Sequence, residues 1–136
     1  MVFEMSSIDH IGIATESIDR SSKFWNMLGF QNSGDEVVES QGVKIRYLEG
    51  DGGTRVELLE PLGEDTPVGR FMEKSGEGVQ QVAVSVENID GVISSLISKG
   101  VRMINEVAVE GSGGHRIAFI HPKSTGGVLV ELVESH

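Results

Sequence analysis

The chain has no cysteine among its 136 residues. This absence excludes disulfide bonds, a thiolate nucleophile and a metal site built on sulfur ligands. Also absent is any apolar run near the ~20 residues that span a bilayer, and the N-terminus lacks the basic-then-apolar order of a signal peptide. We therefore expect a soluble, cytoplasmic protein.

Basic residues are scarce as well. The sequence has 11 lysines and arginines against 21 acidic residues, which gives a formal net charge of -10. Such an excess of negative charge argues against nucleic acid or an anionic membrane as the main partner, although a local basic cluster could hold an anionic small molecule. The length suits one domain, so we expect residues 1–136 to form a single domain with a shared core.

The sequence contains an internal repeat. The stretch His10-Ile11-Gly12-Ile13-Ala14 alternates aliphatic residues with small or polar ones, and Gln81-Val82-Ala83-Val84-Ser85 alternates in the same way. This period of two is typical of a strand with two unlike faces, and it places Gln81 where His10 stands. The same offset of 71 residues relates three further pairs: Ile18 to Ile89, Asp19 to Asp90, and Gly29 to Gly100. A constant offset predicts a duplicated unit, covering about residues 7–60 and 78–134.

Each unit is predicted to have the order βαβββ. In the first unit we expect strands at residues 7–14, 30–38, 43–48 and 55–60. We also expect a helix between Ser17 and Gly29, and its packing face is predicted to consist of Ile18, Phe24, Trp25 and Leu28. In the second unit we expect strands at residues 79–86, 101–109, 116–120 and 128–133, with a helix between Asn88 and Gly100. A short helix from Thr66 to Lys74 joins the units. The expected fold class is α+β, with two tandem βαβββ units forming one curved mixed sheet around a cleft.

Four polar residues occupy equivalent positions in the two units. His10 and Gln81 lie in the two first strands, and Glu57 and Glu131 lie in the two last strands, each on the face opposite a run of aliphatic residues. With the helices packed outside, all four side chains are expected to face the cleft. Ionised carboxylates there are costly to desolvate unless they are paired or bind a cation. One nitrogen ligand with mainly oxygen ligands suits a hard or borderline divalent metal ion.

These residues resemble the vicinal oxygen chelate (glyoxalase/bleomycin resistance) superfamily, and within it the methylmalonyl-CoA epimerases. The resemblance covers nearly the whole chain and is strongest in three stretches: Asp9 to Ala14, Val56 to Pro67, and His121-Pro122-Lys123-Ser124-Thr125-Gly126-Gly127 running on to Leu132. The first stretch is common to much of the superfamily. The last stretch is long and points to the epimerase branch.

The resemblance implies a metal-dependent epimerase that interconverts the two epimers of methylmalonyl-CoA through an enolate. It implies a glyoxalase-like fold, the metal ligands His10, Glu57, Gln81 and Glu131, and Glu131 as a catalytic carboxylate. The implied metal is cobalt, with nickel, manganese or zinc as alternatives, and Lys123 is a candidate for binding the coenzyme A phosphates. Open sheet edges further predict a homodimer.

Two departures from the family pattern leave other functions open. Gln80-Gln81 stands where the family has paired histidines, and Val43-Lys44-Ile45 lacks the glutamate that serves the family as a base, so no second base is assigned from the sequence. The alternatives are a glyoxalase I-type lactoylglutathione lyase and a bleomycin-resistance-type binding protein without catalysis.

Simpler roles compete with the functional ones at several positions. Glu57 and Glu131 could be edge-strand charges that discourage aggregation. His115 and His121 flank a predicted strand and are expected in turns. A set of basic residues could bind phosphate or be scattered surface charges: Arg70, Lys74, Arg116 and Lys123.

Overall fold

The computed structural model describes residues 6–135, which form two compact units. The first unit is residues 10–80, and the second is residues 81–135 together with residues 6–9. The elements of the first half of the chain are β1 Ser7–Ala14, α1 Ile18–Met27, β2 Gln31–Val38, β3 Val43–Glu49, β4 Arg55–Pro61 and α2 Pro67–Ser75. Those of the second half are β5 Gly78–Val86, α3 Ile89–Ser98, β6 Val109–Glu110, β7 Arg116–Ile120 and β8 Val130–Glu134.

The two halves of the chain repeat one topology, as the offset of 71 residues predicts. The strands of the first unit lie in the order β2-β3-β4-β1, and those of the second in the order β5-β8-β7-β6. The first strand of each unit pairs in parallel with the last, whereas the other pairs are antiparallel. The register repeats too, because Gly12 is opposite Glu57 and Ala83 is opposite Glu131. The α+β class and the βαβββ order are confirmed.

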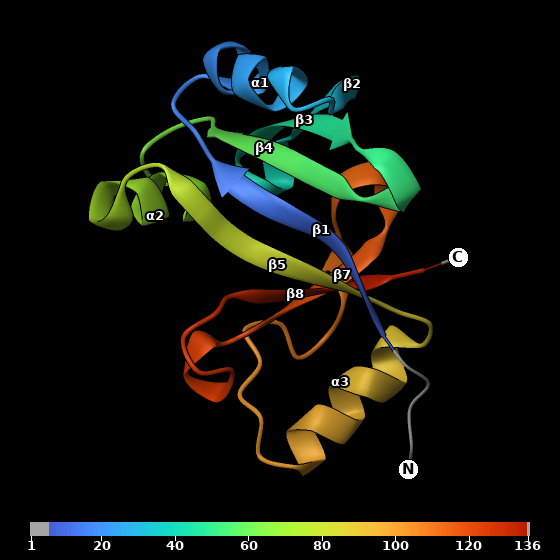
Figure 1. Ribbon diagram of the computed structural model, residues 1–136. Helices are drawn as coiled ribbons and strands as arrows, with labels where there is room; N and C mark the ends of the chain where they lie inside the picture. Colours follow the sequence, from blue (N-terminus) through green and yellow to red (C-terminus); the bar gives the residue numbers. More distant parts are fainter. Residues whose placement is uncertain (1–5, 136) are drawn as a thin grey trace. The chain divides into compact units, whose positions relative to one another are not determined.

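Helix α1 covers one face of the strands of the first unit (Figure 1). The Ser17 side chain caps its N-terminus by accepting a hydrogen bond from the Arg20 N–H, and Gly29 follows its end with a φ of 100°. Ile18 and Trp25 pack against a core cluster that contains Leu48, Val56 and Leu58. The predicted packing face was wrong for Phe24 and Leu28, which are 53% and 60% exposed. Phe24 instead contacts the Trp25 ring edge-on, with the ring centroids 5.6 Å apart.

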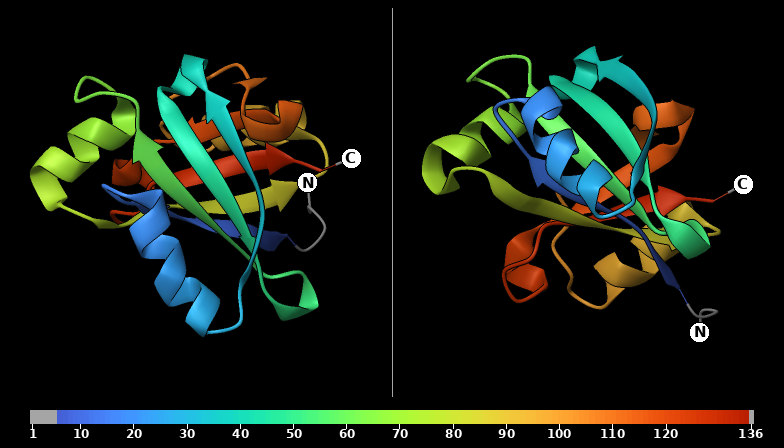
Figure 2. Two further views of the ribbon diagram at one scale, coloured as in Figure 1. Left: turned by 90° about the horizontal axis from the view of Figure 1, so that it is seen from above. Right: turned by 45° about the horizontal axis from the view of Figure 1, so that its top comes forward.

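Helix α2 packs on the same face of the sheet as His10, but only at one end of that face. Its N-cap is Thr66, as expected, and its residues Val68, Phe71 and Met72 contact an apolar cluster on the strands. The members of this cluster from the strands are Ala14, Val38, Val43, Ile45 and Leu59. Figure 2 shows from two further directions how β3 and β4, coloured teal to green, run side by side. This face therefore has an apolar end covered by α2 and a polar end with His10 and Glu57.

In the second unit, α3 packs through Ile89 and Ile93 against Val86, Ala118 and Leu132. The predicted strand over residues 101–109 was wrong, because the described structure has only β6 and an isolated bridge between Met103 and Ile120 there. The Asn105 side chain accepts the Phe119 N–H at 2.9 Å, which occupies a position that a strand carbonyl would otherwise take. Within residues 6–135, no helix combines the length and the apolar character needed to cross a membrane.

Candidate metal centre

A histidine and a glutamate form a buried pair in the first unit. The His10 Nδ1 atom lies 3.2 Å from the Glu57 Oε2 atom, and the two residues are only 3% and 5% exposed. Gly12 is opposite Glu57 in the parallel pairing of β1 with β4, and His10 precedes Gly12 by two residues on the same face. Gly12 contributes no side chain to this face of the strand pair. The local sequence thus creates the pair.

The second unit has a matching pair. The Gln81 Nε2 atom donates a hydrogen bond to Glu131 Oε1 at 2.9 Å, and the two residues are 8% and 6% exposed. The small residue Ala83 is opposite Glu131, two residues after Gln81, just as Gly12 follows His10. Because the amide nitrogen is the donor, the Gln81 carbonyl oxygen remains as the atom with which this side chain could ligate a metal.

A group of donor atoms around His10 suits a divalent cation. Candidate ligand atoms of Asp9, His10 and Glu57 all lie within 4.8 Å of one another. An imidazole nitrogen with carboxylate oxygens is a donor set for a borderline divalent ion, and a cation there would compensate the buried carboxylate. Sequence reasoning missed Asp9, because strict alternation along a strand assigns it to the face opposite His10. Its position next to His10 was the only available signal.

The structure thus brings together the predicted site residues in two pairs, His10 with Glu57 and Gln81 with Glu131. Both pairs are buried, which argues against the interpretation of Glu57 and Glu131 as solvated edge charges. That the four side chains converge on one ion stays a prediction.

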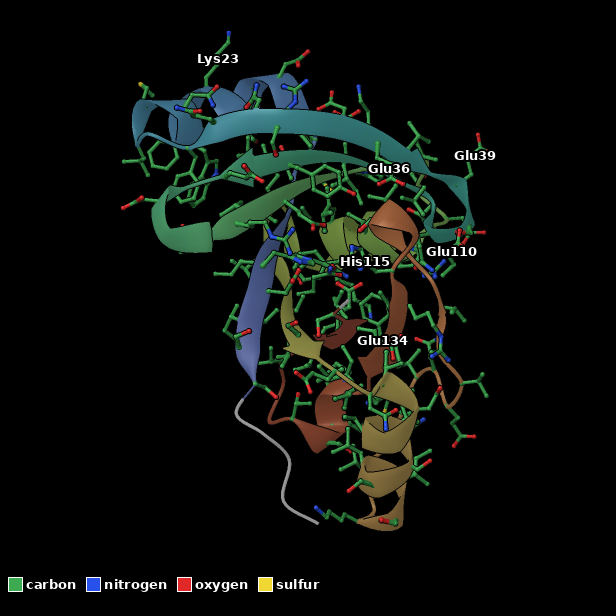
Figure 3. The ribbon with its side chains drawn as sticks, turned by 90° about the vertical axis from the view of Figure 1, so that its right-hand side faces the viewer. Lys23, Glu36, Glu39, Glu110, His115 and Glu134 are labelled. Atoms are coloured by element: carbon green, nitrogen blue, oxygen red, sulfur yellow. The ribbon has the colours of Figure 1, made fainter. Side chains whose placement is uncertain are left out.

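A tyrosine and a second glutamate extend the polar end of the His10 face in the first unit. Tyr47 on β3 is directly opposite Glu57 on β4, so their side chains share one face. The Tyr47 hydroxyl donates a hydrogen bond of 2.5 Å to Glu36 Oε1 on β2. Glu36 is labelled in Figure 3, together with Glu39, which lies beyond the end of the strand. The sequence analysis missed this pair, because no local motif marks a contact across two strands.

The basic residues considered for phosphate binding differ in their contacts. Arg116 is bound to Asp90 at 2.7 Å, and Arg70 in the first unit is bound to Asp65 at 2.8 Å, so both are engaged with carboxylates rather than held ready for phosphate. Lys123 is exposed in the turn Pro122–Ser124, and Arg102 is exposed as well. Within residues 6–135, neither side chain forms an ion pair. Partial loss of water contact, and then the nearby cations Arg102 and Lys123, lower the pKa of His121.

The turn prediction for His115 and His121 is confirmed. His115 follows the turn Ser112–Gly114, and its Nδ1 atom lies 3.3 Å from the Glu134 carbonyl oxygen. Both residues are labelled in Figure 3. His121 caps the next turn, where its Nδ1 atom accepts the Lys123 N–H at 3.1 Å.

Comparison with known proteins identifies the family of this chain. The sequence signature of the Glyoxalase/Bleomycin resistance protein/Dioxygenase superfamily matches residues 9–119. The chain belongs to this superfamily. The resemblance noted from the sequence is therefore confirmed, and so is the glyoxalase-like fold.

Individual members of the glyoxalase superfamily match almost the whole chain. The uncharacterized protein YqjC of Bacillus subtilis is 39% identical over 96% of this chain and 93% of its own length. The mitochondrial methylmalonyl-CoA epimerase of Homo sapiens is 33% identical over 98% of this chain and 77% of its own length. A methylmalonyl-CoA epimerase solved in complex with methylmalonyl-CoA and NH4+ superposes with a TM-score of 0.89 at 40% identity, covering 97% of this chain and 96% of that one.

Proposed function

We propose that this superfamily member is a metal-dependent methylmalonyl-CoA epimerase, an isomerase acting on an acyl-CoA. The main support is that each repeat unit has one buried glutamate in contact with a side chain from its first strand. The contacts are His10 with Glu57 and Gln81 with Glu131, and they lie at equivalent positions in the two strand pairings. Relatives named methylmalonyl-CoA epimerase over nearly the full chain support the choice of substrate.

The four residues His10, Glu57, Gln81 and Glu131 would hold the divalent ion, for which cobalt is our first choice and nickel, manganese or zinc are alternatives. When bound, the ion would supply positive charge that stabilises an enolate oxygen of the substrate. Such a set requires residues of both repeat units, so we also propose that residues 1–136 act as one vicinal oxygen chelate domain.

Glu131 is the proposed catalytic carboxylate. It lies in the buried pair of the second unit, where the Gln81 amide N–H donates to one carboxylate oxygen and so orients the group for proton transfer. Epimerisation removes the proton of the substrate α-carbon and returns a proton to its other face, so it needs an acid and a base. Burial of Glu131 excludes water, which would otherwise compete for the proton.

Lys123 is the proposed contact for the phosphates of coenzyme A. Its ammonium and the Arg102 guanidinium both act on His121, so two cations are close together at one turn of a strongly acidic chain. The backbone supports this arrangement, because the Arg102 N–H donates to the Ser124 Oγ atom at 2.8 Å and the His121 N–H donates to the Arg102 carbonyl at 2.9 Å. We also propose that the protein is cytoplasmic, because a polyanionic thioester substrate would be retained in the cytoplasm.

We propose a homodimer as the working state. Strand β2 has β3 as its neighbour on one side and, in the described part of the chain, no strand on the other. Val37 on this edge strand is 52% exposed. An edge with unpaired backbone groups and an exposed apolar side chain is suited to contact with a second copy.

Solvent exchange tests the proposed reaction. In deuterated buffer the metal-loaded protein should exchange the α-proton of methylmalonyl-CoA, because each turnover passes through the enolate. Glu131→Gln should reduce the exchange rate by about 10²–10⁴-fold, the range for loss of one general acid or base, with little change in KM. Lys123→Ala should instead raise KM and leave kcat nearly unchanged. Mass spectrometry of the thioester measures both variants.

Two outcomes would contradict the proposal. One is exchange that proceeds equally well after the metal is removed with a chelator. The other is no exchange by metal-loaded protein in which His10, Glu57 and Glu131 are intact. Turnover of the glutathione–methylglyoxal adduct would then identify a glyoxalase I-type lyase, and binding without turnover of either compound would identify a binding protein.

A further inference from the structure

The proposed epimerisation needs a proton-transferring group besides Glu131, and the polar end of the His10 face offers a carboxylate for it. On this face Tyr47 on β3 is opposite Glu57 on β4. Two residues before Tyr47 on the same strand, Ile45 is opposite Glu36 on β2. Neighbouring strands lie about 4.8 Å apart and residues rise about 3.4 Å each along a strand, so the Glu36 backbone is about 12 Å from that of Glu57, two strands over and two residues along, with β3 between them. This separation leaves room for a small acyl group beside an ion held by Glu57.

The Tyr47 hydroxyl fixes the position of the Glu36 carboxylate. Its hydrogen bond to Oε1 is 2.5 Å long. The tyrosine ring is itself anchored, because it packs against the apolar cluster under α2. Tyr47 and Glu36 are both only partly buried, so the carboxylate is neither sealed in the core nor a freely moving surface charge.

Comparison of the two repeat units shows that the fold does not require this pair. In the second unit the residue opposite Glu131 is Phe119, where the first unit has Tyr47 opposite Glu57. Ile117, the counterpart of Ile45, is paired with Val109 rather than with a glutamate. The same positions therefore accept apolar side chains. A hydroxyl and a carboxylate in one unit alone point to a chemical role.

We propose that Glu36 is the second proton-transferring carboxylate of the reaction and that Tyr47 is its positioning residue. This inference rests on the proposed function. Glu36 takes the proton from the α-carbon of one epimer, and the C–H electron pair moves toward the thioester oxygen to form the enolate. The protonated Glu131 then gives its proton to the other face of the α-carbon. The other epimer reacts in the reverse direction, with Glu131 as base and protonated Glu36 as acid, so protons and electrons balance.

The test follows each epimer separately. Glu36→Gln keeps an oxygen that accepts the Tyr47 hydroxyl but removes the base. We expect this variant to lose at least 100-fold in interconversion and in exchange of the α-proton of one epimer, while exchange from the epimer served by Glu131 continues. Its affinity for methylmalonyl-CoA by calorimetry and its metal-induced rise in Tm should match wild type, because Glu36 is not a proposed ligand of either.

Two further variants complete the test. Tyr47→Phe copies the residue of the second unit and should lower kcat by about tenfold with KM unchanged, since Glu36 is present but no longer oriented. Glu39→Gln makes the same substitution three residues on, at an exposed position, and should leave both exchange reactions as in wild type.

The inference and the proposed function fail in different ways. If wild type exchanges both epimers and Glu36→Gln does the same, the role of Glu36 is refuted while the epimerase stands. Equal loss of exchange from both epimers, with a smaller metal-induced rise in Tm, would likewise refute it and indicate a structural role. If metal-loaded wild type exchanges neither epimer, the proposed function fails and this inference fails with it.

Discussion

At the scale of single residues, His10 and Gln81 occupy equivalent positions but offer different ligand atoms. An imidazole nitrogen binds cobalt, nickel or zinc more strongly than a neutral amide oxygen does. Gln81→His should therefore strengthen metal binding, whereas His10→Ala should remove most of it. Because an ion bound only by the folded state stabilises that state, saturation at 100 times Kd adds about 2.7 kcal/mol. Thermal unfolding at a series of metal concentrations measures the change.

Gln80→His is the matched control for this prediction. Gln80 is buried like Gln81, but alternation along β5 turns its side chain to the other face of the strand. The control should leave the metal-induced rise in Tm unchanged. If Gln81→His also leaves it unchanged while His10→Ala abolishes it, Gln81 is not a ligand and a three-residue site replaces the four-residue one.

At the scale of elements, a single carboxylate ties the start of α1 to the segment before β5. Glu77 accepts hydrogen bonds from the Glu16 N–H at 2.8 Å and the Thr15 hydroxyl at 3.0 Å, and it pairs with the Arg20 guanidinium. The Glu16 N–H, followed by the Thr15 hydroxyl and Arg20, holds the pKa of Glu77 below its ordinary value. The folded state therefore favours the ionised form.

A lowered pKa in the folded state predicts a loss of stability in acid. The contribution of Glu77 should be complete above the unfolded value of about 4.3 and should disappear as the pH falls through the lower folded value. Because Glu77 is 39% exposed, we expect Glu77→Gln to cost only about 1 kcal/mol at pH 7. Urea unfolding at pH 7 and near pH 3 measures the difference.

The same substitution at Glu73 gives the control. Glu73 is an exposed residue of α2, and its charge should contribute little at either pH. A Glu77→Gln variant that loses as much stability at pH 3 as at pH 7 would show that the ionised carboxylate is not what holds these segments together.

At the scale of the whole molecule, net charge and open strand edges act against each other. Two copies with a formal charge of -10 repel each other, and salt screens this repulsion over about 8 Å at physiological ionic strength. We therefore expect a homodimer whose dissociation constant falls as salt is raised from about 0.01 M to 0.15 M. Light scattering on diluted protein measures the mass. A monomer at every salt concentration would rule out the proposed dimer.

The sequence alone determined the repeat, and the repeat led to both polar pairs. Alternation along a strand is a local property, so His10, Gln81, Glu57 and Glu131 could be assigned to faces by counting residues. Caps are local as well, which is why α1, α2 and α3 begin at the expected residues Ser17, Thr66 and Asn88.

Only the tertiary structure decided what lies beside these residues. The Tyr47 contact with Glu36 depends on the register of β2 against β3, which is set by packing across the sheet rather than by neighbours in sequence. The segment 101–109 has a strand-like composition, yet the Asn105 side chain takes the place of a backbone partner. Phe24 has the spacing of a buried residue but is 53% exposed. In each case the outcome depends on partners far apart in the chain, and local patterns contain no information about them.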